Sequence, residues 1–211
     1  MTGDVLAPAG VLLLAPAGTA LLARGTLLAL ATACFGAFGW ALRGHFVSSG
    51  PVPAGMRGLA ALSLGAFAWF ALGLARGPLG PAWPASLALL AASLALFAWA
   101  VRATRSARLA LAFAPDVPRC LVASGPYAHV RHPFYAAYLA FWTATALARP
   151  GLAPWAAPAA FAAAYAWAAS AEEARFAHST LAPAYAAYRR RCGMFLPRLR
   201  RPLAPRAPTP R

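Results

Sequence analysis

The side chains best suited to chemistry stand in two short segments about forty residues apart. Residues 125–135 are Gly-Pro-Tyr-Ala-His-Val-Arg-His-Pro-Phe-Tyr, and residues 172 and 173 are both glutamate. Arg131 and His132 can donate hydrogen bonds to an anion, and the following proline suits the first turn of a helix, whose amides also attract an anion. The tyrosine rings suit a cation, and Glu172 can accept from hydroxyl or ammonium groups. Together these residues suit a ligand that carries an anion, a cation and hydroxyls.

Each of these residues, taken alone, has a structural explanation. Gly-Pro-Tyr turns commonly precede membrane helices, and Arg, His and Tyr side chains are at home at the lipid interface. Glu172 could pair with Arg175 as a surface ion bridge worth roughly a few tenths of a kcal/mol. As an ordered set, in a chain with only four acids, they favour a binding site instead. His129 and His178 lack such support, and we expect both at the solvated interface.

The elements that must position these residues are membrane helices. Hydrophobic residues make up 61% of the chain and charged residues 11%, which is outside the soluble globular range. The chain has 211 residues, enough for one helical bundle without a separate soluble catalytic domain, so any site must use helix ends and loops. Apolar windows of about twenty residues predict five spans, at 20–42, 58–76, 83–101, 134–148 and 152–170.

The segments outside these spans divide the chain further. Residues 5–19 are apolar but contain two prolines and two glycines, and could form a sixth or re-entrant segment. The first arginine stands at position 24, so a cleaved secretory signal is not expected. We expect an N-terminal apolar segment at 1–19, a membrane domain at 20–197 with its motif region at 119–197, and a disordered Arg/Pro-rich tail at 198–211.

Arginine placement predicts the orientation of the spans. Of the 19 basic residues, all arginine, only Arg24, Arg76 and Arg149 fall outside the first loop, the third loop and the C-terminal part. The positive-inside rule therefore puts the N-terminus outside and the C-terminus in the cytosol, as expected for a protein of a bacterial inner membrane. The net charge of +15 flanks the membrane, which favours anionic lipid as a partner and not nucleic acid. The three cysteines show no ligand spacing, so we expect neither a metal site nor a disulfide framework.

A longer set of residues resembles one enzyme family. Residues 121–127, Leu-Val-Ala-Ser-Gly-Pro-Tyr, lead into Val-Arg-His-Pro-Phe-Tyr at 130–135, and the glutamate pair is followed by Tyr-Ala-Ala-Tyr at 185–188 and Phe-Leu-Pro at 195–197. This order resembles the isoprenylcysteine carboxyl methyltransferase family, which is related to the phospholipid N-methyltransferases. The resemblance covers about residues 119–197. It implies an integral-membrane enzyme that uses S-adenosylmethionine.

The resemblance also implies roles for single residues. Cofactor contacts are expected from Arg119, Cys120, Leu121, Val122, Tyr127, His132, Pro133, Phe134, Tyr135 and Glu172. Arg131 and Glu173 are the candidate catalytic residues, Arg131 as a cation for a carboxylate acceptor, with Arg175 as the alternative cation, and Glu173 as an acid or base for an amine acceptor. A carboxylate with a pKa near ~4 is already ionised at neutral pH, whereas an amine with a pKa near ~10 must first lose a proton.

Two departures from the family pattern concern the acceptor and the segment after the glutamates. Eukaryotic prenylcysteine enzymes resemble one another in an arginine four residues before the first glutamate, where this chain has Ala168. The usual Phe-Gly before Tyr-x-x-Tyr is Leu-Ala at 181–182. We therefore expect a lipophilic small molecule or lipid as acceptor, and a farnesylated cysteine to be a poor one.

One more helix is predicted after the glutamates. Its apolar face comprises Phe176, Leu181, Tyr185 and Tyr188, and it restarts at Pro183. It either anchors the chain to the cytosolic leaflet or closes the cofactor pocket. The sequence thus predicts an all-α integral membrane methyltransferase with about five transmembrane helices and a C-terminal interfacial helix over a cytosolic pocket. An NADPH-dependent membrane steroid or sterol reductase and a non-catalytic scaffold stay as alternatives.

Overall fold

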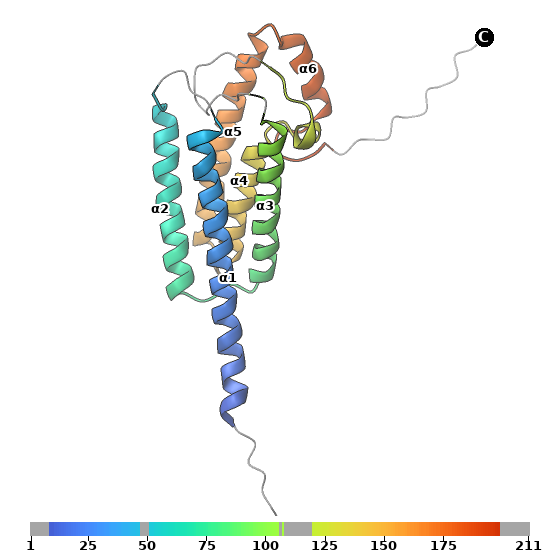
Figure 1. Cartoon of the computed structure of the whole chain (residues 1–211). Helices are drawn as coiled ribbons and strands as arrows, with labels where there is room; N and C mark the ends of the chain where they lie inside the picture. Colours follow the sequence, from blue (N-terminus) through green and yellow to red (C-terminus); the bar gives the residue numbers. More distant parts are fainter. Residues whose placement is uncertain (1–8, 47–50, 106, 108–119, 199–211) are drawn as a thin grey trace, which may run out of the picture.

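The computed structural model describes residues 9–46, 51–105, 107 and 120–198. Its helices are α1 (Ala9–Gly44), α2 (Ala54–Arg76), α3 (Trp83–Ala103), α4 (Pro133–Leu147), α5 (Ala156–Ala177) and α6 (Ala182–Arg191), with 3-10 turns η1 (Gly125–Ala128) and η2 (Ala153–Trp155). Figure 1 shows α1 to α5 side by side in a bundle, with α6 at one end. The all-α prediction is confirmed for this described part of the chain.

Among the described residues, three helices are long and apolar enough to cross a bilayer, namely α1 from Gly18 to Gly44, α2 and α3. α1 begins at Ala9, so the described part of residues 5–19 continues into the first span without a break. α4 has 15 residues, or about 22 Å of helix against a hydrocarbon core of about 30 Å. α5 has 22 residues but carries both glutamates in its last turns. Beyond three spans, the count of five stays a prediction.

The outside of the bundle is apolar. Large side chains exposed there include Leu21, Leu22, Trp40, Leu62, Leu64, Trp69, Leu72, Trp99 and Trp167. Leaving such a surface in water costs about 25 cal/mol per Å² of apolar area, a cost that lipid tails remove. This surface and the three apolar helices indicate association with a membrane.

Two buried serines on α3 fix the position of α4. The hydroxyls of Ser86 and Ser93 donate to the carbonyl oxygens of Ala144 and Ala137, each at 2.7 Å. The small alanine side chains let the two helices approach closely, and such interhelical bonds are each worth about 1 kcal/mol in an apolar interior. Because the serines lie about two turns apart, they hold α4 in one register, which sets the height of its first residue, Pro133.

The two ends of the bundle carry different arginines. Those at the end where α1, α3 and α5 finish include Arg43, Arg57, Arg102, Arg131 and Arg175. At the opposite end, the Arg24 guanidinium lies 3.5 Å from the carbonyl oxygen of Ala75, and Arg149 lies 5.2 Å from the centroid of the Trp69 ring. The structure thus separates the described arginines as the orientation prediction requires, while the side of the membrane stays a prediction.

Thiol labelling tests that orientation. Cys120 is exposed, whereas Cys34 and Cys192 are buried, so the native chain offers one accessible thiol. The positive-inside rule predicts that the arginine-rich end lies in the cytosol, so Cys120 should resist a membrane-impermeant maleimide in sealed cells and react after permeabilisation. In a Cys120→Ser background, Leu152→Cys, at a position 89% exposed in the opposite turn, should react from outside. Labelling of Cys120 in sealed cells would contradict the orientation.

Candidate functional site

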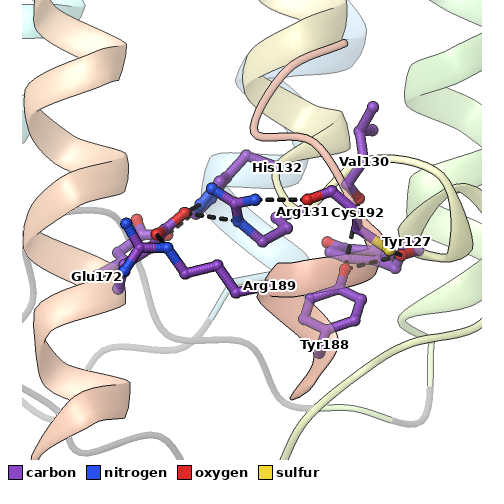
Figure 2. Close-up of polar contacts among 9 residues, drawn as sticks. Tyr127, Val130, Arg131, His132, Glu172, Tyr188, Arg189 and Cys192 are labelled. Carbon is purple, nitrogen blue, oxygen red and sulfur yellow. Dashed lines mark hydrogen bonds and ion pairs between the residues drawn. The ribbon is translucent and has the colours of Figure 1, made fainter. Parts of the chain in front are cut away.

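The two sequence segments singled out for chemistry meet where α4 begins and α5 ends. His132 precedes α4 as its N-cap, and Pro133 occupies the first turn, where a missing amide hydrogen costs nothing. Glu172 and Glu173 stand in the last turns of α5, antiparallel to α4. Figure 2 shows Glu172 beside Arg131 and His132, with Arg189 of α6 reaching toward them. Two helix ends therefore position the predicted side chains.

Glu173 is the centre of a cationic cluster. Its Oε1 lies 2.8 Å from Arg131 Nε and 3.2 Å from His132 Nε2, and its Oε2 lies 3.3 Å from Arg189 Nε. The side chains of Arg131 and Glu173 are each 6% exposed, so their ion pair is buried. A buried carboxylate is tolerated only when cations and hydrogen bonds replace water, which these three partners do.

Glu172 is more open and has different partners. Tyr135 of α4 donates its hydroxyl hydrogen to Glu172 Oε1, and His132 Nδ1 lies 3.5 Å from Glu172 Oε2. The Glu172 side chain is 28% exposed. His132 thus bridges the two glutamates with both ring nitrogens, which is the arrangement of a protonated imidazole.

Burial and neighbours shift two pKa values in this cluster. Burial raises the pKa of Glu173, but hydrogen bonds from His132 and Arg131 and their charges outweigh it and lower the pKa to about 2. Burial lowers the pKa of His132, but the hydrogen bonds and charges of Glu172 and Glu173 outweigh it and raise the pKa above its usual value. The cluster therefore favours an ionised Glu173 and a protonated His132.

Stability should depend on pH accordingly. The lowered pKa of Glu173 contributes about 3 kcal/mol above pH 4.5, lost as the pH falls toward 2. The raised pKa of His132 contributes below pH 6.5 and its contribution is lost as the pH rises through the folded-state pKa. We expect maximal thermal stability between about pH 4.5 and 6.5. His132→Gln should flatten the alkaline decline, and an unchanged decline in that variant would refute the assignment.

A C-terminal segment covers the cluster through side-chain bonds. Tyr188 of α6 donates its hydroxyl hydrogen to the carbonyl oxygen of Tyr127 at 2.7 Å, and the Cys192 thiol lies 3.3 Å from the carbonyl oxygen of Ala128. Arg131 Nη1 donates to the carbonyl oxygen of Cys192 at 2.5 Å. Arg131 thus joins the end of α5 to the segment after α6, and Figure 2 shows it between them.

Backbone pairing extends this contact beyond α6. The amides of Arg131 and His132 donate to the carbonyl oxygens of Gly193 and Met194, at 2.8 and 3.1 Å. Glycine is required at position 193, because a Cβ there would collide with the carbonyl oxygen of Leu196. The turn that follows places the Phe195 ring edge-on to the His132 ring, with 6.1 Å between the ring centroids.

Aromatic rings line the α4 and α5 side of the site. The Tyr135 ring stacks on the rings of Tyr165 in α5 and of His132, with 5.2 and 5.6 Å between the ring centroids. Phe195 meets Tyr135 edge-on at 6.4 Å, so rings from three parts of the chain surround the Tyr135 ring. Both faces of Tyr135 are therefore covered within the chain, while Phe195 is half-buried.

Other residues predicted for the site lie around this centre. Phe134 turns away from the glutamates and packs with Phe46 and Phe97. Leu121 packs on the cluster of Tyr185, Tyr188 and Cys192. Within the described part, Tyr127, Pro133 and Phe134 are buried, Val122 is half-buried and Cys120 is exposed. Arg119 lies outside the described residues.

Three residues that hold the site together were not predicted to belong to it. Tyr188 was expected on an apolar helix face, Arg189 on anionic lipid, and Cys192 had no expected role. Two sequence signals were available: the Tyr-Ala-Ala-Tyr element at 185–188, which the family resemblance includes, and the Cys-Gly pair that follows α6, since glycine after a helix marks a chain reversal. His129, as expected, stays apart from the glutamates and packs beside Trp99 at 5.9 Å.

No family model, no curated protein and no solved structure matches the chain. The function must therefore be argued from the residues and their geometry.

Proposed function

We propose that this protein is a membrane methyltransferase that uses S-adenosylmethionine and methylates a lipophilic acceptor. One observation carries the proposal. The Arg-His-Pro-Phe-Tyr segment at 131–135 and the glutamate pair form one polar network at a bundle end, under a cover of residues 188–195. A network that only supported the fold would need neither the half-open Glu172 nor stacked rings beside it.

The donor set fits the proposed cofactor. S-adenosylmethionine supplies an electrophilic methyl group on a sulfonium, beside an amino-acid end and a ribose. Glu172 is the open carboxylate of the site and would accept from the ammonium or ribose hydroxyls in exchange for its bond from Tyr135. The half-buried Phe195 ring would face the cationic part.

Arg131 and Glu173 serve as positioning residues in this proposal. Arg131 uses Nε on Glu173 and Nη1 on the carbonyl oxygen of Cys192, so these donors hold the cover in place. Glu173, with its pKa lowered to about 2, is a poor proton acceptor for an amine. A carboxylate acceptor, already ionised at neutral pH, needs alignment and desolvation in place of a base, and is the better match.

Isothermal titration of the detergent-purified protein tests the cofactor. We expect S-adenosylhomocysteine to bind, because Glu172 can accept from its ammonium group or ribose hydroxyls. We expect NADPH not to bind at this site, because Arg131 is already engaged by Glu173 and by the carbonyl oxygen of Cys192. NADPH binding alone would indicate a reductase, and no binding of either would indicate a scaffold. A radiolabelled methyl-transfer assay on total membrane lipid extract, run beside N-acetyl-farnesylcysteine, then identifies the acceptor class. Labelling of the farnesylcysteine alone would show that the arginine absent at Ala168 is not needed.

A further inference from the structure

A groove of about 410 Å³ opens between the end of α5 and α6, next to Glu173. Its floor consists of alanines and Tyr185. Its polar lining is Arg189, Arg190 and Arg198 around the single carboxylate of Glu173. This groove lies on the α6 side of the cluster and no step of the proposed methyl transfer uses it. Its lining carries an excess of positive charge that suits an anionic ligand.

Two of the arginines around the groove make contacts within the described part of the chain. Arg198 Nη1 donates to the carbonyl oxygen of Arg190 at 2.9 Å, which keeps its guanidinium beside α6. Arg189 Nε pairs with Glu173 Oε2, while its side chain stays 62% exposed. Glu173 also has Arg131 and His132 on its other oxygen, so Arg189 can share its remaining donors with a ligand without leaving the carboxylate unpaired.

We propose that this groove binds the phosphate of one anionic phospholipid. Planar guanidinium groups match phosphate oxygens in bidentate pairs, and three of them meet here. The apolar part of the lining, Ala182, Ala186 and Tyr185, suits the glycerol region that follows the phosphate. A lipid whose headgroup carries a positive charge beside the phosphate should bind less tightly, because the arginines repel that charge.

A lipid is favoured over a free phosphate by the neighbouring surface. Leu196, two residues before Arg198, is 79% exposed at the same end of the bundle. An exposed leucine next to arginines is the pattern of a segment that lies at the boundary between headgroups and acyl chains. α6 lies at this end of the bundle, close to where α3 and α5 finish (Figure 1).

Lipid in the groove would hold the cover of the site in place. Arg189 and Arg190 belong to α6, which also contributes Tyr188 to the carbonyl oxygen of Tyr127. A phosphate that bridges Arg190 and Arg198 ties α6 to the segment that follows it. This contact would add to the bonds that already hold the cover over the site.

Titration of the full chain in a neutral detergent tests the lipid site without any cofactor, so its outcome is separate from that of the proposed function. The ligands are dihexanoylphosphatidic acid, dihexanoylphosphatidylcholine and inorganic phosphate. We expect one phosphatidic acid to bind per chain, at least about tenfold more tightly than either other ligand. Arg190→Gln and Arg198→Gln should each weaken it about fivefold.

The matched control is Arg191→Gln. Arg191 is an exposed neighbour of Arg190 on α6 and does not line the groove. Its substitution should change phosphatidic acid affinity less than about twofold. Equal losses for Arg190→Gln and Arg191→Gln would mean diffuse surface charge and would overturn the proposal. So would equal affinity for phosphatidylcholine, or inorganic phosphate that binds as tightly as phosphatidic acid.

Discussion

Replacing Arg131 by Met should lower the free energy of unfolding by about 3–5 kcal/mol, the cost of leaving a buried charge without its partner. Glu173 would keep His132 and the exposed Arg189 but lose its buried cation, and the carbonyl oxygen of Cys192 would lose its donor. Methionine fills a similar volume, so a packing defect adds little. Reversible unfolding in mixed micelles, followed by far-UV circular dichroism, measures the change.

Two further variants separate this ion pair from general effects of charge. Arg57→Met removes an exposed arginine at the same end of the bundle and should change stability by less than about 0.5 kcal/mol. Glu173→Gln added to Arg131→Met removes the unpaired charge and should recover part of the loss. If Arg131→Met cost no more than Arg57→Met, the buried pair would not hold the cover of the site.

The sequence could predict the elements that are governed by local chemistry. Apolar runs of about twenty residues mark α1, α2 and α3, because bilayer thickness sets their length. The first turn of α4 follows from Pro133, whose missing amide hydrogen suits only a helix start. Whether α4 and α5 also cross the bilayer was harder to predict, since hydropathy windows measure apolarity and not the length of helix that forms.

The arrangement of the site needed information that no local pattern contains. Val130 pairs with Gly193 across about sixty residues, through backbone groups that every residue carries. Arg131 illustrates the same limit. Its residue type shows that it can donate to an anion. It does not show that this anion is a carboxylate of the chain itself, Glu173, and not a ligand. Likewise, the spacing of Tyr188 predicts an apolar helix face, while its hydroxyl group bonds a specific carbonyl oxygen.

The second large effect concerns ligand affinity. His132→Ala and Glu172→Ala should each weaken S-adenosylhomocysteine binding roughly ten- to hundredfold, because each removes a charge-assisted contact worth about 1.5–3 kcal/mol. The two side chains are neighbours in the network, since Glu172 Oε2 lies 3.5 Å from His132 Nδ1. Titration calorimetry measures the affinity, and a thermal unfolding scan of each variant shows that it is folded.

The histidines outside the network provide the controls. His129 packs beside Trp99, and His178 is exposed just after α5, so neither touches the glutamates in the described part of the chain. His129→Ala and His178→Ala should therefore leave affinity within about twofold. Equal weakening in all four variants would mean that affinity follows general stability and that the site is elsewhere. A loss confined to His132→Ala and Glu172→Ala would instead place the ligand between the start of α4 and the end of α5, beneath the cover formed by residues 188–195.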